Sequence, residues 1–282
     1  GLGVMGFPMA GHLANFGHEV TVYNRTKSKA IKWLENFKGN VAETPKLASF
    51  NADIIISCVG NDNDLKEITL SKDGAFQSIN KNATFVDHST VSASVTRELY
   101  RLAKIKEFNF VDAPISGGQA GAENGQLSIM CGGDDIAFEK ALPVMKVYSK
   151  ICRLMGGPGS GQLTKMVNQI CIAGLVQGLS EGLNFAQKAK LDAKSVAEVI
   201  SQGAAGSWQM NNRHETMIEG NYNFGFAVDW MRKDLKICMD EADRNGAVLT
   251  ITSIVDQFYK EIQNSGGGRL DTSSLLKRLQ DS

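Results

Sequence analysis

The first six residues of the chain restrict its fold more than any other segment. Gly1-Leu2-Gly3-Val4-Met5-Gly6 is a Gly-x-Gly-x-x-Gly run, and an apolar pattern with helical spacing follows it. In a dinucleotide-binding fold, the first glycine makes a tight turn, the second lets the backbone approach a pyrophosphate, and the third lets helix and sheet pack closely. The run therefore predicts a cofactor phosphate at a helix N-terminus, where free N–H groups attract anions. A tight strand-to-helix turn without a ligand is the alternative.

The end of the next predicted strand, over residues 19–23, indicates which dinucleotide would bind. Asn24-Arg25-Thr26 follow this strand. A fold that prefers NAD usually carries Asp or Glu here, which accepts a hydrogen bond from the ribose 2′-hydroxyl. This chain has no acid at that point, and a guanidinium beside a hydroxyl suits a 2′-phosphate. The segment therefore favours NADP(H), with NAD(H) still possible; a solvated Arg25 at the strand end is the alternative.

Strand-like apolar runs then alternate with helical patterns. The runs cover residues 53–59, 84–87, 108–112 and 151–154. The continuous apolar run at 53–59 is typical of a strand buried on both faces of a parallel sheet. No strand-like segment precedes Gly1, so we expect the first strand of the sheet to belong before it. We predict an α/β domain over residues 1–155, with a mostly parallel, doubly wound sheet.

Several polar residues stand where these strands end. In such sheets, ligands bind beyond the carboxyl ends of the strands. Val59, Ser89 and Thr90 are therefore candidates for contacts with the nicotinamide, and ordinary strand-end turns are the alternative. His88 lies at the same strand end, but no Asp or Ser pattern completes a triad with it. We expect His88 to have a structural role.

Ser116-Gly117-Gly118 comes before a short segment rich in Ala and Gly. Backbone N–H groups and one hydroxyl can converge there without a bulky side chain in the way. The segment thus predicts a compact anion site that would hold a carboxylate or a phosphate. The alternative is that the glycines only turn the chain.

From residue 156 onward the pattern is almost entirely helical, and we predict an all-helical domain over residues 156–282. Helical periodicity covers residues 163–186, 192–203, 207–218, 228–245, 249–264 and 272–281. Gly174, Gly178 and Gly182 recur every four residues on the first of these helices. Because glycine costs about 1 kcal/mol in a helix interior, this stripe predicts a second helix packed closely against it, from this chain or from another subunit.

Near the start of that long helix, Lys165, Asn168 and Gln169 share one face, because residues three and four apart are neighbours on a helix. Taken alone, Lys165 could be a surface lysine whose stem lies on the core and whose charge stays in water. The alternative is a partly buried ammonium that exchanges a proton.

Composition excludes several classes of partner. Thirty basic residues balance thirty acidic ones, which gives no indication of nucleic acid or an anionic membrane surface. The five cysteines are scattered, with no Cys-x-x-Cys and no Cys/His cluster at metal-ligand spacing, so we expect no metal site. Reduced buried thiols fit a cytoplasmic protein. No membrane span or signal peptide is visible in the sequence.

Four motifs in order give the chain a resemblance to the β-hydroxyacid dehydrogenases. These are Gly-Leu-Gly-Val-Met-Gly-Phe-Pro-Met-Ala, Asp-Ala-Pro-Ile-Ser-Gly-Gly, Gly-x-x-x-Lys-Met-Val-Asn-Gln and Lys-Asp-Leu. The family includes 3-hydroxyisobutyrate dehydrogenase, tartronate semialdehyde reductase and the glyoxylate/succinic semialdehyde reductases. The resemblance covers essentially the whole chain. It implies a Rossmann domain, a long interdomain helix, a helical C-terminal domain and a homodimer or homotetramer.

The resemblance also implies roles for individual residues. It makes Lys165 the general acid/base and implies oxidation of a short 3-hydroxy acid, or reduction of its semialdehyde, with NADP(H). The positions that it places at the substrate are Ser116, Gly117, Gly118, Asn168, Lys233 and Asp234. It also places Thr90 and Lys233 near the cofactor, and Asn24-Arg25-Thr26 is similar to the NADP-preferring members.

Other members of this superfamily remain as alternatives. A decarboxylating 6-phosphogluconate dehydrogenase is usually much longer and has a His in the loop where this chain has Pro158-Gly159-Ser160-Gly161. Imine reductases replace the lysine, so Lys165 argues against that activity. Non-catalytic NADP-binding interaction modules have also lost it.

Overall fold

The computed structural model describes residues 1–280 and divides into two compact units, Gly1–Lys165 and Met166–Ser282. The first unit contains a six-stranded sheet. In spatial order its strands are β3 (Ile54–Ser57), β4 (Thr84–Asp87), β5 (Asn109–Asp112), β7 (Leu127–Gly133) and β6 (Ile115–Ser116), with β8 (Ser149–Leu154) paired to β7. A separate parallel pair joins β1 (Thr21–Val22) to β2 (Asn40–Val41). The pairs β5–β7 and β6–β7 are antiparallel and the others are parallel, so the predicted mostly parallel α/β fold is confirmed.

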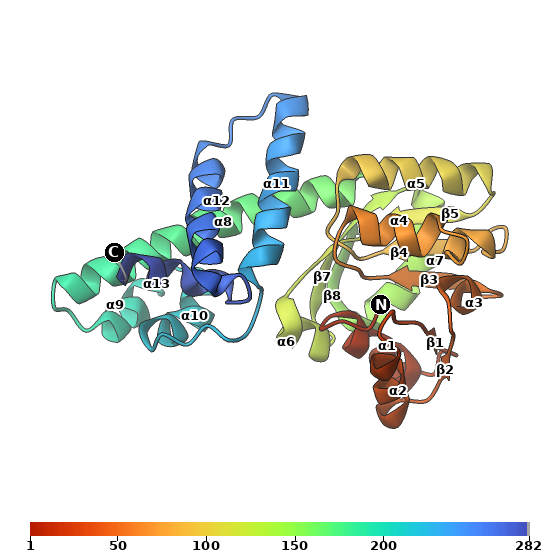
Figure 1. The fold of residues 1–282 in the computed structure, drawn as a ribbon, viewed down its shortest axis with the longest axis horizontal. Helices are drawn as coiled ribbons and strands as arrows, with labels where there is room; N and C mark the ends of the chain where they lie inside the picture. The colour runs from red at the N-terminus through yellow and green to blue at the C-terminus, as the bar shows by residue number, and fades with distance from the viewer. Residues whose placement is uncertain (281–282) are drawn as a thin grey trace. The chain divides into compact units, whose positions relative to one another are not determined.

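Helices cover both faces of this sheet (Figure 1). Side chains alternate along each strand, so Phe85 and Phe110 pack into one apolar cluster while Val86 and Val111 pack into another. The first cluster includes residues of α4 (Asp62–Leu70) and α5 (Ala93–Ile105), and the second includes residues of α1 (Gly6–Phe16) and α7 (Asp135–Met145). The remaining helices of this unit are α2 (Lys27–Asn36), α3 (Pro45–Ser49), α6 (Gly118–Glu123) and the 3₁₀ turns Ala75–Gln77 and Lys146–Tyr148.

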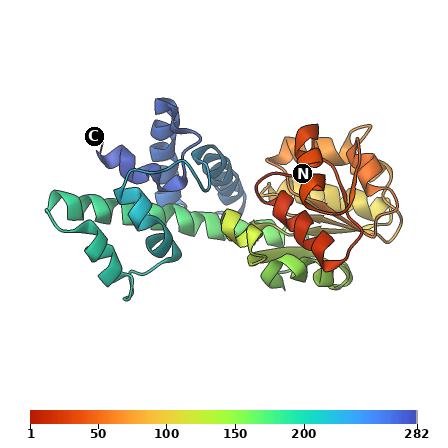
Figure 2. The same cartoon turned by 90° about the horizontal axis from the view of Figure 1, so that it is seen from below.

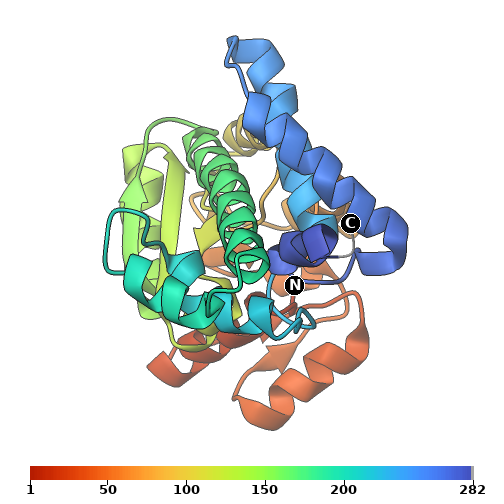
Figure 3. The ribbon, with the colours of Figure 1, turned by 90° about the vertical axis from the view of Figure 1, so that its left-hand side faces the viewer.

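The second unit is helical, as predicted. Helix α8 (Ser160–Lys188) is one continuous helix that begins in the first unit and continues into the second. It is the long green helix of Figure 2, partly covered there by a yellow-green segment. The other helices are α9 (Ala193–Ile200), α10 (Trp208–Ile218), α11 (Val228–Asn245), α12 (Thr250–Ile262) and α13 (Leu275–Gln280). Helices α11 and α12 lie side by side (Figure 3) and share an apolar cluster with the middle of α8. A second cluster joins the later part of α8 to α9 and α10.

The last predicted helix starts later than expected. Asp271 accepts hydrogen bonds from the Ser273 N–H and hydroxyl, which shapes a 3₁₀ turn over Thr272–Ser274 before α13 begins. The predicted end at residue 281 lies outside the described residues. Within residues 1–280, none of the helices has both the length and the apolar character needed to cross a bilayer.

The glycine stripe on α8 has no close neighbour among the described residues of this chain. A Cβ atom added at Gly178 or Gly182 would meet nothing within 4 Å, and one added at Gly174 would meet only Ile251 Cγ2, at 3.9 Å. No described helix of this chain therefore packs closely at Gly178 or Gly182, and only a Cβ at Gly174 would have a neighbour within 4 Å, in α12. Packing by another subunit stays a prediction.

Candidate cofactor and substrate site

Two of the three glycines in the opening run are fixed by packing. A Cβ added at Gly1 would lie 2.7 Å from the carbonyl oxygen of Cys58, and one added at Gly6 would lie 1.9 Å from the carbonyl oxygen of Gly1. No side chain fits at either position. A Cβ added at Gly3 would meet nothing within 4 Å, so packing does not require glycine there. Open space beside Gly3 leaves its backbone accessible, and its predicted role, as part of a glycine cradle (residues 1–6) that holds a dinucleotide phosphate, stays a prediction.

The N-terminus of α1 adds donors to this cradle. Met5 is its N-cap and provides no side-chain hydrogen bond, so the first N–H groups of the helix are not capped by that residue. The loop is held from the other side by Asn24, whose Oδ1 accepts from the Leu2 N–H (2.8 Å) and whose Nδ2 donates to the Thr26 carbonyl (3.0 Å). Asn24 thus joins the glycine loop to the end of β1. These residues fit the phosphates of a nicotinamide dinucleotide.

Arg25 and Thr26 stand at the N-terminus of α2. The Arg25 side chain is 84% exposed, and its Nη1 lies 3.1 Å from Asp64 Oδ1. Thr26 is the N-cap residue of α2, but its hydroxyl makes no capping hydrogen bond. One guanidinium, one hydroxyl and a helix N-terminus therefore occupy the position predicted for the ribose 2′-substituent.

The ends of β3 and β4 are joined through the buried carboxylate of Asp87. Its Oδ1 accepts hydrogen bonds from the Ser57 hydroxyl (2.7 Å) and the Ser89 hydroxyl (2.6 Å). The Ser89 hydroxyl oxygen in turn accepts from the Val59 N–H (2.8 Å). The structure thus brings together Val59 and Ser89, which were predicted separately from two strand ends. Neither Ser57 nor Asp87 was among the predicted site residues.

Asp112, at the end of β5, holds the start of α8. Its two carboxylate oxygens accept from the N–H groups of Gly159 (2.8 Å) and Gln162 (3.0 Å). Burial raises the pKa of Asp112 to about 7, while the hydrogen bonds from Gly159 and Gln162 act to lower it. Gly161 passes so close to β5 that an added Cβ would lie 2.6 Å from the Asp112 carbonyl oxygen. Sequence reasoning missed Asp112 as a cap, because it is far from α8 along the chain.

Lys165 is buried. It lies early in α8 and is the last residue of the first unit, with only 8% of its surface exposed. A buried ammonium is costly unless partners hold it, so such a lysine is atypical of a solvated surface residue. The reading of Lys165 as a surface charge is therefore wrong.

The Ser116-Gly117-Gly118 segment joins β6 to α6. Gly117 has φ of +133° and Gly118 has φ of +62°, so both occupy backbone conformations that favour glycine. A Cβ at Gly118 would meet nothing within 4 Å. The turn alone therefore explains why these residues are glycines, and their role at a carboxylate stays a prediction.

The predicted residues of the second unit form one polar chain between α8 and α11. The Asn168 amide donates to Gln169 Oε1 (2.7 Å), and the Gln169 amide donates to Asp234 Oδ2 (2.7 Å). The Lys233 ammonium lies 2.9 Å from Asp234 Oδ1 and 5.9 Å from the centre of the Trp230 ring. Gln169 and Asp234 are buried. The structure therefore links Asn168, Asp234 and Lys233, with Gln169 as the bridge.

His88 belongs to the core. Its Nδ1 pairs with the Ala113 carbonyl oxygen (2.5 Å), and its Nε2 pairs with the Tyr148 hydroxyl (2.9 Å). Burial lowers the pKa of His88 to about 4, so it is neutral near pH 7. Both ring nitrogens are engaged, which supports the expected structural role.

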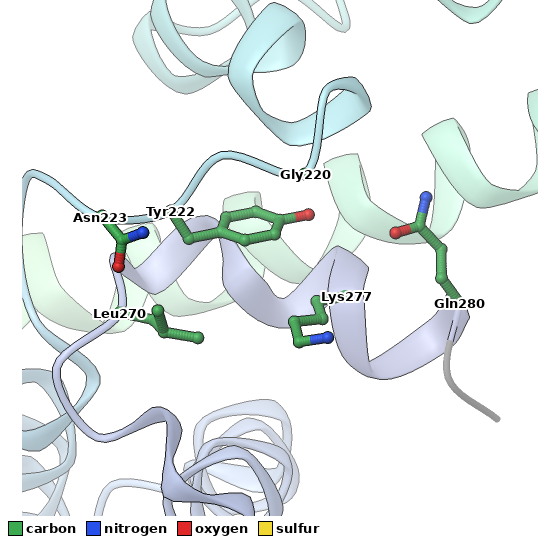
Figure 4. Close-up of a pocket in the computed structure, with 6 residues that line it drawn as sticks. All are labelled: Gly220, Tyr222, Asn223, Leu270, Lys277 and Gln280. Carbon is green, nitrogen blue, oxygen red and sulfur yellow. The ribbon is translucent and has the colours of Figure 1, made fainter.

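Figure 4 shows a pocket in the second unit, lined by Tyr222, Leu270, Lys277 and three neighbouring residues. None of its residues is among those predicted for the cofactor or substrate. Within residues 1–280, no three His, Cys, Asp or Glu side chains form a group that could hold a metal ion.

Both units of the chain match families of known proteins. Residues 1–157 match the NAD binding domain of 6-phosphogluconate dehydrogenase, and residues 159–279 match the NAD-binding domain of NADP-dependent 3-hydroxyisobutyrate dehydrogenase. An oxidoreductase of Shewanella frigidimarina is 57% identical over 100% of this chain and 97% of its own length. The 2-hydroxy-3-oxopropionate reductase of Escherichia coli is 33% identical over 99% of this chain and 95% of its own length.

A solved structure gives the same result for the fold. The 3-hydroxyisobutyrate dehydrogenase of Mycobacterium tuberculosis, with L-serine, superposes with a TM-score of 0.89 and 26% identity, over 99% of this chain and 97% of that one. The glycine cradle, the strand ends and the start of α8 are thus parts of a nicotinamide-dependent enzyme, and the chain belongs to the β-hydroxyacid dehydrogenase family of NAD(P)-dependent oxidoreductases.

Proposed function

We propose that this enzyme interconverts a short 3-hydroxy acid and its semialdehyde, prefers NADP(H), and uses Lys165 as general acid/base. The burial of Lys165 at the start of α8 is the observation on which the proposal rests. The names of two relatives support the substrate class, since 2-hydroxy-3-oxopropionate and 3-hydroxyisobutyrate both carry a carboxylate and an oxygen on carbon 3. The exposed Arg25 and the hydroxyl of Thr26 support the cofactor preference.

The chemistry assigns a separate task to each group of residues. Bound NADPH would supply a hydride to the aldehyde carbon, and the oxygen then needs a proton. The ammonium of Lys165 donates a hydrogen bond to that oxygen, stabilises the negative charge that develops, and transfers the proton. In the oxidation direction, the neutral amine takes the proton from the hydroxyl group. The Ser116–Gly118 segment holds the substrate carboxylate and so fixes the reacting carbon.

The test is a comparison of Lys165→Ala with the wild type, by NADPH oxidation with succinic semialdehyde, glyoxylate, tartronate semialdehyde and methylmalonate semialdehyde. We expect the variant to lose at least ~10²-fold in kcat while NADPH still binds, because proton transfer from a positioned group contributes about that much. Lys188→Ala is the matched control, since Lys188 is an exposed lysine on the same helix.

Two outcomes would reject parts of the proposal. A Lys165→Ala enzyme with near-normal kcat would exclude this residue as the proton donor. A wild-type enzyme that binds NADPH but oxidises it with none of the four aldehydes would favour a non-catalytic NADP-binding module.

A further inference from the structure

Gln162 makes an arrangement of hydrogen bonds that the proposed mechanism does not use. Its side chain is buried, with 1% of its surface exposed. Its Nε2 donates to the carbonyl oxygen of Ser89 (2.8 Å), and its Oε1 accepts from the N–H of Val91 (3.1 Å). One amide side chain therefore holds the backbone on both sides of Thr90.

The same residue is part of the helix that carries Lys165. Gln162 is in the first turn of α8, and its own N–H donates to Asp112 at 3.0 Å. Lys165 follows three residues later, which is about one turn and ~4.5 Å along the helix axis. The Gln162 amide thus connects the segment predicted to line the nicotinamide with the turn that holds the predicted proton donor.

We propose that Gln162 is a positioning residue that keeps the Thr90 segment and the Lys165 turn of α8 in register. The inference rests on the proposed function, since it concerns the geometry of that reaction. The hydrogen bonds made by Gln162 continue through Ser89, whose hydroxyl accepts from the Val59 N–H at 2.8 Å and donates to Asp87 at 2.6 Å. Gln162 thereby joins α8 to both strand ends, β3 and β4.

Only a side chain with one donor and one acceptor can make this pair of contacts. An apolar side chain at 162 would leave the Ser89 carbonyl and the Val91 N–H without this partner in a buried place, where an unmade hydrogen bond is costly. The Thr90 segment would then shift relative to α8. A displacement of about 1 Å in an active site can reduce turnover ~10²-fold.

Gln162→Glu tests the inference because its effect on kcat should depend on whether the introduced carboxyl group is protonated. A protonated carboxyl has an O–H that donates to Ser89 and a carbonyl that accepts from Val91, so it restores both contacts. An ionised carboxylate has no donor and repels the Ser89 carbonyl. Burial and the nearby carboxyl groups of Asp87 and Asp112 raise the pKa of the new carboxyl. The loss of activity should therefore be reversed by acid.

The measurement is kcat and the KM for NADPH of each variant relative to wild type, from pH 5.5 to 8.5, well below the melting temperature. We expect the kcat of Gln162→Glu to be reduced at least ~10-fold at high pH and to approach wild type at low pH, with KM for NADPH little changed. Gln162→Leu should be slow at every pH. A ratio to wild type that stays constant with pH, or a Gln162→Leu enzyme with wild-type kcat, would overturn the inference.

Gln177→Glu is the matched control, because Gln177 is a buried glutamine on the same helix that donates to Glu181 (2.6 Å) and contacts neither Ser89 nor Val91. It should lose stability without the acid reversal of kcat.

Hydrogen exchange separates the two proposals. If wild type reduces no aldehyde, the proposed function fails, but the Val91 N–H should still exchange faster in Gln162→Leu than in wild type or Gln177→Leu. Equal protection of Val91 would reject the role of Gln162 even in an active enzyme.

Discussion

Replacement of Arg25 by alanine should reduce the preference for NADPH, and the structure sets the size of the effect. A hydrogen bond from a guanidinium to a phosphate contributes about 1.5–3 kcal/mol. In the described structure, Arg25 instead pairs with Asp64 at 3.1 Å, and its side chain is 84% exposed. Such an exposed ion pair contributes about 0–1 kcal/mol, which binding of the 2′-phosphate must replace. The net contribution is therefore about 0.5–3 kcal/mol, or roughly 2- to 150-fold in affinity.

The assay is the ratio of kcat/KM for NADPH to kcat/KM for NADH. Arg25→Ala should lower this ratio by that factor, mainly through the NADPH term. Asp64→Asn is the complementary variant: it removes the competing carboxylate and should raise the ratio, by up to ~5-fold. A wild-type enzyme that is faster with NADH, or an Arg25→Ala enzyme with an unchanged ratio, would refute the assignment of Arg25 to the 2′-phosphate.

Two further predictions concern the loop and the core. Gly6→Ala should lower the melting temperature strongly, because its Cβ would lie 1.9 Å from the Gly1 carbonyl oxygen. Gly3→Ala should melt like wild type but bind NADPH at least ~10-fold more weakly in a fluorescence titration. Equal melting temperatures of the two variants would contradict this prediction. The pKa of His88 is about 4 in the folded protein and near 6.5 in the unfolded chain. Because the unfolded chain therefore binds a proton more readily, the free energy of unfolding should fall by up to about 3 kcal/mol as pH falls from ~6.5 to ~4. His88→Gln should flatten the fall of melting temperature over that range and keep most of kcat at pH 7; an unchanged slope or a large loss of kcat would show that His88 has another role.

Local sequence patterns predicted the helices and strands whose apolar residues follow a clear periodicity. The apolar run at 84–87 is strand β4, and the helical periodicity of residues 207–218 and 228–245 corresponds to α10 and α11. Other boundaries differ: the strand predicted over 19–23 is only Thr21–Val22, and α8 extends beyond the predicted residues at both ends. The Gly-x-Gly-x-x-Gly run correctly indicated a nicotinamide-binding domain. The steric need for glycine at position 6 comes from Gly1, five residues earlier, whereas the need at position 1 comes from Cys58, which is distant in the sequence.

The contacts that organise the site could not be predicted in the same way. Asp112 caps a helix that starts about 50 residues later, and Gln162 binds backbone groups more than 70 residues earlier. Nothing in the local sequence distinguishes this glutamine from a solvated one, because its partners are a backbone carbonyl and a backbone N–H, which almost any residue type would provide. From the sequence, Asp87 is only the last residue of a predicted strand. Its role as the acceptor for Ser57 depends on the pairing of β3 with β4. Tertiary structure, rather than propensity, gives these residues their roles.

The continuity of α8 has a consequence for any motion of this enzyme. The boundary between the two units falls directly after Lys165, whereas Asn168 belongs to the second unit, and both residues lie on one unbroken helix. Their separation along the axis, ~4.5 Å, is set by backbone hydrogen bonds inside the helix. A local rearrangement that leaves α8 intact therefore cannot alter the spacing between the predicted proton donor and the amide that follows it.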